Sequence, residues 1–260
     1  MPFSSIRVGR TAGVARVTLD RPDVRNAFNA QVIAELHAAF DELGRDPETY
    51  AVVVAGEGKA FCGGADVNWM RASLDLPHDR NVDDARAMSE MFRAIDRCPK
   101  PTIARIQGAA LGGGAGLAAV CDVVIASDDA LFGFTETKLG IIPAVISPFV
   151  LAKVGASHAR ALFLTGERFD ARRAQAIGLV HEVVASDALD GAVDRILTEL
   201  RTAGPEAVAA AKRLISDVCA LSYDESRDHT AHAIAKQRTG AEGQEGLRAF
   251  LERRSAGWSK

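Results

Sequence analysis

Two glycine-rich segments, each placed between an apolar run and a helix, constrain this chain more than any other feature. The first, Lys59 to Val67 (KAFCGGADV), follows the apolar run Ala51 to Ala55 (AVVVA). The second, Gly108 to Leu117 (GAALGGGAGL), follows Thr102 to Ile106 (TIARI). A short, nearly continuous apolar run predicts a strand that is buried on both faces. The pattern therefore indicates parallel strands that lead through glycine loops into helices.

The same alternation continues on both sides of these loops. Val14 to Leu19 predicts another strand, and Asn29 is placed to cap a helix with an apolar face from Val32 to Leu43. Val123 to Ala126 predicts the next strand, whereas beyond about Ser147 we expect helices only. The prediction is an α/β core followed by a helical C-terminal part.

Composition excludes several classes of protein. The 260 residues are 48% hydrophobic and carry a formal net charge of −3, which gives no reason to expect nucleic acid or a membrane as partner. Met1 to Thr11 is polar and lacks a signal core, and two prolines interrupt the apolar run Leu139 to Ala152, so we expect a cytoplasmic protein.

The charged stretch Arg71 to Arg86 is expected to be an exposed loop or loose helix. His229 and His232 lack a third ligand, and we expect no metal site.

Glycine loops at the starts of helices suit one kind of chemistry. They let a ligand approach the backbone, where unpaired N–H groups carry partial positive charge. Two such groups aimed at one point would stabilise a developing oxyanion, and losing one typically costs roughly 3–4 kcal/mol of transition-state stabilisation. Two other interpretations remain open. Glycines also permit tight helix–strand packing, and Gly114 to Ala119 matches a loose G-x-G-x-x-A dinucleotide pattern that leaves the first loop unexplained.

Ordered motifs over nearly the whole chain resemble the enoyl-CoA hydratase/isomerase (crotonase) family. Besides the two glycine loops, they are Asp20-Arg21-Pro22, Arg25-Asn26-Ala27, Cys121-Asp122, Phe132 to Pro143, Leu164-Thr165-Gly166, Ala174 to Val180 and Phe250 to Arg254. The resemblance implies a ββα spiral core over residues 1–200 and a C-terminal helical trimerisation region over 201–260, in a homotrimer or dimer of trimers. It also implies an acyl-CoA thioester as substrate, with no separate cofactor.

The resemblance assigns roles to individual residues. The N–H groups of Ala65 and Gly113 would hold the thioester oxygen as it becomes an enolate. Glu136 would transfer protons, and the apolar residues around it are expected to raise its pKa. Gly116 stands where typical hydratases carry a second glutamate. Residues that would contact coenzyme A are Arg25, Ala27, Gly64, Asp66, Val67, Phe250 and Arg253, the last two in many relatives from a neighbouring subunit.

The glycine at position 116 leaves several reactions open. Our first expectation is an enoyl-CoA hydratase that adds water across the 2,3 double bond with Glu136 alone. A 3-enoyl-CoA to 2-enoyl-CoA isomerase needs one base, a decarboxylase needs chiefly the oxyanion site, and a non-catalytic acyl-CoA-binding relative is a further alternative. The stretch Ile142 to Phe149 is similar to a bacterial branch of methylglutaconyl-CoA-like hydratases, which predicts a branched, carboxylated substrate.

Overall fold

Two β-sheets form the centre of the molecule in the computed structural model, which describes residues 3–259. The larger sheet has six strands in the order β1-β2-β3-β4-β6-β9, antiparallel at β1–β2 and parallel elsewhere. The smaller has the order β5-β7-β8. The strands are β1 (Ile6–Thr11), β2 (Val14–Leu19), β3 (Ala51–Gly56), β4 (Thr102–Ile106), β5 (Ala109–Leu111), β6 (Val123–Ser127), β7 (Leu131–Gly133), β8 (Arg168–Asp170) and β9 (Glu182–Val184).

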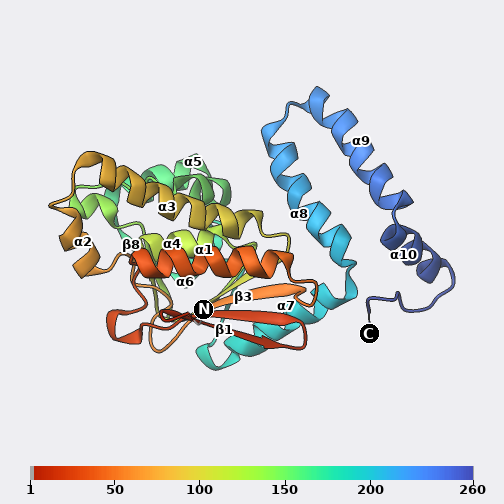
Figure 1. Cartoon of the computed structure of the whole chain (residues 1–260), viewed down its shortest axis with the longest axis horizontal. Coiled ribbons are helices and arrows are strands. Elements are labelled where there is room, and N and C mark those ends of the chain that lie inside the picture. The colour runs from red at the N-terminus through yellow and green to blue at the C-terminus, as the bar shows by residue number, and fades with distance from the viewer. Residues whose placement is uncertain (1–2, 260) are drawn as a thin grey trace.

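Helices cover the larger sheet, and three more extend from it as an arm (Figure 1). Three short 3-10 turns, η1 (Pro22–Val24), η2 (Glu136–Leu139) and η3 (Ser186–Ala188), join these elements. The α-helices are α1 (Ala30–Arg45), α2 (Val67–Ser73), α3 (His78–Arg97), α4 (Gly113–Val120), α5 (Ser147–Thr165), α6 (Ala171–Ala176), α7 (Leu189–Thr202), α8 (Pro205–Ala220), α9 (Tyr223–Thr239) and α10 (Ala241–Leu251). Within the described residues, no helix is both long and apolar enough to cross a membrane.

Strand β3 is apolar throughout because it contributes to two cores. Val52 and Val54 belong to the larger core, together with buried residues of α1, α3 and α4, whereas Ala51 and Val53 pack with α7 on the opposite face. Successive side chains of a strand point to opposite faces of the sheet. The strands predicted from Val14, Ala51, Thr102 and Val123 onward are confirmed, and so is the Asn29 cap, whose side chain accepts a hydrogen bond from the Val32 N–H.

One expectation was wrong in part, and the structure defines two segments that the sequence left open. Strands β8 and β9 lie beyond Ser147, where only helices were expected; each has three residues, too few for periodicity to reveal. Strand β1 lies in the polar N-terminal segment, for which no secondary structure was predicted; an edge strand can expose most of its side chains. The stretch Arg71 to Arg86, expected to be an exposed loop or loose helix, contains the end of α2 and the first turns of α3, and most of its charged side chains are exposed.

The arm formed by α8, α9 and α10 stands away from the sheets (Figure 1). Its helices pack on one another, and Lys212 of α8 joins the arm to the core through an ion pair with Asp122 at 2.8 Å. Large apolar side chains on the arm remain exposed, including Tyr223 (87%) and Phe250 (80%). Trimerisation of this region stays a prediction.

Candidate active site

The first glycine loop is held in place by backbone hydrogen bonds to residues 25–28. Gly63 N–H donates to the Arg25 carbonyl at 2.7 Å, Phe28 N–H donates to Gly64 at 2.7 Å, and Asp66 N–H donates to Phe28 at 2.8 Å. In such pairing alternate residues point their backbone groups toward the partner. The N–H of Ala65, between two paired residues, therefore points away from residues 25–28.

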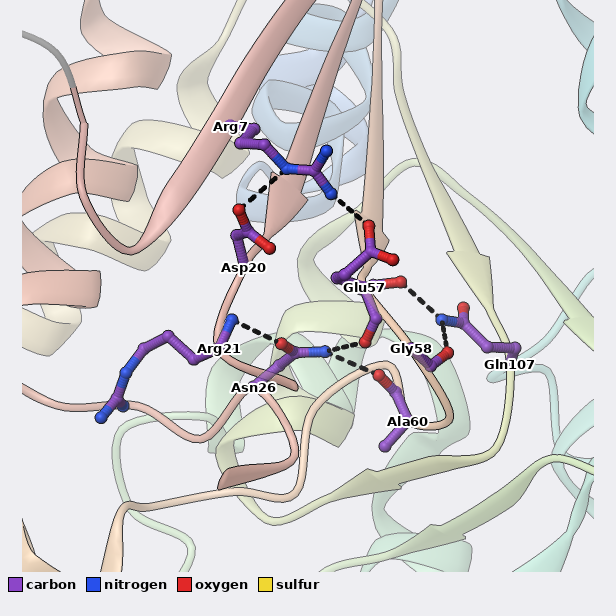
Figure 2. Close-up of polar contacts among 9 residues, drawn as sticks. Arg7, Asp20, Arg21, Asn26, Glu57, Gly58, Ala60 and Gln107 are labelled. Carbon is purple, nitrogen blue, oxygen red and sulfur yellow. Dashed lines mark hydrogen bonds and ion pairs between the residues drawn. The ribbon is translucent and has the colours of Figure 1, made fainter. Parts of the chain in front are cut away.

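Buried polar side chains fix the segments that hold this loop. Asp66 caps α2 and accepts hydrogen bonds from Asn68 N–H and, at 2.7 Å, from Arg21 Nη2. The Arg21 hydrogen bond lowers the pKa of Asp66. Asn26 is 1% exposed and donates to the carbonyls of Glu57 and Ala60, while its own carbonyl oxygen accepts from Arg21 N–H (Figure 2). The first loop is thus fixed largely by polar contacts.

The second glycine loop runs beside the first and opens into α4. Cys62 N–H donates to the Ala109 carbonyl and Leu111 N–H donates to Cys62, each at 3.0 Å, so the two loops pair as short parallel strands. Gly113 is the first residue of α4, where N–H groups lack an intrahelical acceptor. Within residues 3–259, no hydrogen-bond acceptor is found for the N–H groups of Ala65 or Gly113.

A cavity of about 390 Å³ opens beside these two residues. Ala65 is exposed and Gly113 half-buried, so a ligand in the cavity can reach their backbones. Most of the wall is apolar. The cavity is lined by Gly63, Gly64, Ala65, Trp69, Met70, Ser73, Asn81, Asp84, Ala85, Met88, Gly112, Gly113, Thr135, Glu136, Leu139, Ile141, Ile142, Pro143, Ala144, Val145 and Ile146.

Glu136 places its carboxyl group at the edge of the second loop. A Cβ added to Gly112 would lie 3.2 Å from Glu136 Oε1. In the described structure, Glu136 Oε2 is buried and has no hydrogen-bond partner. Burial raises the pKa of this carboxyl, as its apolar neighbours predicted. A buried carboxyl with an open lone pair suits proton exchange with a ligand.

Gly116 lies one turn further along α4, and Ile146 fills the space where its side chain would be. A Cβ at position 116 would lie 2.1 Å from Ile146 Cγ2, far inside van der Waals contact. Ile146 lines the cavity and is 2% exposed. No carboxyl group can therefore stand at position 116 without moving Ile146.

The predicted coenzyme contacts fall into three groups. Gly64 lines the cavity, and Arg25 and Val67 are exposed next to the first loop. Ala27 and Asp66 are buried, and their polar groups already have partners: the Ala27 carbonyl accepts from Arg21, and the Asp66 carboxylate accepts from Arg21 and the first N–H groups of α2. The structure therefore does not place these two residues in contact with a ligand. Phe250 and Arg253 are exposed on and just after α10, on the arm.

Three residues near the site were missed as contributors. Ile146 and Asp84 line the cavity. Asn26 anchors the first loop; the sequence marked it as part of a motif but gave it no role. Position in a cavity leaves no mark on local sequence for the first two. For Asn26, the Arg25-Asn26-Ala27 motif was the available signal, but its bonds to the Glu57 and Ala60 carbonyls depend on tertiary structure.

The two unpaired amides border an apolar cavity and can polarise the carbonyl group of a bound ligand. The half-buried carboxyl group nearby can move a proton on an adjacent carbon. Chemistry of this kind defines a class of enzymes that act on acyl groups through an enolate. The protein-family model described as enoyl-CoA hydratase/isomerase matches residues 9–260 of the chain. The chain belongs to this family and is an enzyme of it, so the non-catalytic alternative is set aside.

Individual relatives agree on the family and the fold. The chain is 36% identical over 262 residues to "Probable enoyl-CoA hydratase echA8" of Mycobacterium tuberculosis, with 98% of each chain covered. An enoyl-CoA hydratase structure from Shewanella pealeana has a TM-score of 0.95 and 38% identity over 98% of this chain and 96% of that one. Pseudomonas aeruginosa AtuE has a TM-score of 0.96 and 37% identity over 99% and 100%. The predicted crotonase-like fold is confirmed.

Proposed function

We propose that the protein hydrates a 2-enoyl-CoA thioester and that Glu136 transfers the protons. The observation that carries this proposal is the buried, unpartnered Glu136 Oε2 at the cavity bordered by the free amides of Ala65 and Gly113. Relatives described as enoyl-CoA hydratases support the same reaction.

The geometry suggests a sequence of steps. The thioester oxygen accepts hydrogen bonds from Ala65 and Gly113, which withdraws electrons from C3 of the conjugated double bond. Ionised Glu136 takes a proton from water as the water oxygen bonds to C3, and the π electrons move onto the thioester oxygen. Glu136 then returns the proton to C2, and the carbonyl reforms. Water is added and no other reactant is consumed.

The Gly116–Ile146 contact favours isomerisation as the second candidate. Because Ile146 blocks a carboxyl group at position 116, Glu136 would handle every proton. An isomerase needs one base, which removes a proton from C2 of a 3-enoyl thioester and delivers it to C4. A coupled assay with a 3-enoyl-CoA separates the two: appearance of the 2-enoyl ester before any hydration product supports isomerisation.

We further propose a neutral acyl group. The described lining residues include the carboxyl groups of Asp84 and Glu136 but no Lys, Arg or His, so an acyl carboxylate would find no cation in the cavity of one chain. The methylglutaconyl-like substrate remains a second candidate, favoured by the stretch Ile142 to Phe149. The matched pair 3-methylcrotonyl-CoA and 3-methylglutaconyl-CoA differs by this carboxylate. Faster hydration of the first is expected, and faster hydration of the second would overturn the neutral assignment.

The catalytic role of Glu136 is tested by Glu136→Gln, which keeps the shape of the side chain but cannot accept the proton. We expect kcat for hydration of crotonyl-CoA to fall by about 10²–10⁴-fold. Glu48→Gln, at an exposed position, is the matched control and should keep full activity. Undiminished turnover by Glu136→Gln would remove Glu136 from the reaction.

We also propose that another copy of the chain covers the exposed apolar residues of the arm, in a homotrimer or dimer of trimers. The exposure of Tyr223 and Phe250 supports this, because isolated arms rarely keep such surface open to water. Light scattering should give a mass three or six times the 27.6 kDa of one chain. A monomeric mass would contradict it.

A further inference from the structure

We propose that Ile146 sets the size of the acyl group that the cavity accepts, and that Gly116 forms the recess that receives the Ile146 side chain. This inference rests on the proposed binding of an acyl thioester. Ile146 has one side on the cavity and its Cγ2 in the recess above Gly116. The fit of this one side chain into the recess therefore determines the position of the cavity wall.

The recess is rigid on its other side. The Cζ atom of Phe92 would lie 3.4 Å from a Cβ at position 116. Phe92 is fully buried and packs between the rings of Phe28, at 6.3 Å, and Phe149, at 5.6 Å. Close-packed aromatic rings do not shift at low cost. A group added in the recess would therefore move Ile146, and the cavity is the open space into which Ile146 can move.

The backbone around Ile146 is also fixed. Ile146 stands immediately before α5, and its carbonyl accepts a hydrogen bond from Val150 N–H at 3.1 Å. Ser147 Oγ donates to the Ala144 carbonyl at 2.7 Å and closes the preceding turn. The side chain of Ile146, rather than its backbone, is thus the part that can adjust.

Ile146 lies close to where the chemistry would take place. Gly113 and Gly116 are three residues apart in α4 and share one face of the helix, separated by roughly 5 Å, or about one turn. If the Gly113 amide binds the thioester oxygen, Ile146 contacts the first carbons of the acyl chain. Ile146 then determines whether an acyl chain that is branched or longer at those carbons fits in the cavity.

Two substitutions on opposite sides of this contact should change selectivity in opposite directions. Ile146→Ala empties the recess and enlarges the cavity, so the kcat/KM ratio of 3-methylcrotonyl-CoA to crotonyl-CoA should rise roughly tenfold, as one methyl group in an apolar pocket is worth about 10–200-fold. Gly116→Ala pushes Ile146 into the cavity and should lower the same ratio. Ile146→Val keeps the Cγ2 methyl group in the recess and removes only Cδ1, so its ratio should lie between those of the wild type and Ile146→Ala.

Thermal unfolding separates a selectivity role from a structural one. A lower Tm with an unchanged ratio in Ile146→Ala, or ratios that move in the same direction in both variants, would overturn the proposal. If Gly116→Ala does not fold, the double variant Gly116→Ala/Ile146→Ala fills the recess with the new methyl group. It should fold and show a ratio below that of Ile146→Ala; an equal ratio counts against the proposal.

Binding measurements keep this inference distinct from the proposed reaction. If the wild type turns over no enoyl thioester, the proposed function fails. Calorimetry with the saturated esters butyryl-CoA and isovaleryl-CoA then tests Ile146 alone. Ile146→Ala should bind isovaleryl-CoA more tightly relative to butyryl-CoA, and an unchanged relative affinity would refute the role of Ile146.

Discussion

The two glycine loops border the same cavity and are both held by backbone hydrogen bonds, but what adds to those bonds differs. Polar side chains support the first, through the Arg21–Asp66 pair at 2.7 Å and the bonds of Asn26 to the Glu57 and Ala60 carbonyls. Close packing supports the second: no side chain caps α4, and its glycines admit neighbouring groups to within contact distance of the backbone. The first loop therefore depends on the charge and polarity of side chains, and the second on the absence of side chains.

Each loop also has one carboxyl group beside it, and the two differ in the same way. Asp66 has its hydrogen-bonding capacity used by Arg21 and the start of α2, and its pKa is lowered. Glu136 has an unpartnered oxygen, and burial raises its pKa. A carboxylate whose hydrogen bonds are made stabilises the fold around it, whereas a carboxyl group with an unpartnered oxygen destabilises the fold and is available for proton transfer. The contrast distinguishes a structural carboxyl from a candidate catalytic one.

The largest effect on this comparison is expected from a methyl group added where the two loops touch. In Gly114→Ala the new Cβ would lie 2.4 Å from the Cys62 carbonyl oxygen, and the backbone of the first loop cannot easily move away. We expect a loss of about 3 kcal/mol in the free energy of unfolding, at the upper end for overpacking, together with loss of activity. Urea unfolding followed by circular dichroism measures it.

The control for Gly114→Ala is Gly191→Ala in α7, where an added Cβ meets no atom within 4 Å. Alanine is the better helix former, so this change should raise stability by about 0.5–1 kcal/mol. Equal effects of the two substitutions would mean that the second loop is not held by packing.

A smaller effect is expected when the first loop loses its ion pair. Asp66→Asn keeps the size of the side chain but weakens the bond to Arg21 and the cap of α2, at a cost of about 1–2 kcal/mol near pH 7. Because the pKa of Asp66 is lowered in the folded state, its stabilising contribution is present above the ordinary pKa and is lost as pH falls through the folded value. The difference from wild type should therefore shrink at acidic pH. A difference that does not change with pH would contradict the ion-pair explanation.

The sequence predicted the backbone of the site better than its walls. Glycine runs after apolar strands located both loops, and the resemblance to the crotonase family gave the candidate amides of Ala65 and Gly113 and the candidate proton-transferring Glu136. The Ile146–Gly116 contact joins residues thirty positions apart, and no local pattern marks such a pair. The Asp66–Arg21 pair also depends on tertiary proximity. Local propensity therefore accounts for elements and loops, but not for which side chains meet across them.

The smallest expected effect is on stability, from Glu136→Gln. Because burial raises the pKa of Glu136, the folded protein holds this proton more tightly than the unfolded chain does. The stabilising contribution of the protonated form is therefore complete below the ordinary pKa and is lost as pH rises through the folded value. Glutamine never ionises, so the variant should unfold at a higher Tm than wild type at pH 8, by about 2 °C for a gain of up to about 1 kcal/mol. At pH 4 the two should coincide. Scanning calorimetry across this pH range tests the sign of the change in Tm, which is opposite to the change in stability expected for Asp66→Asn. A variant less stable than wild type at pH 8 would mean that the Glu136 carboxylate has hydrogen-bond partners after all. The contrast between the two carboxyl groups would then fail.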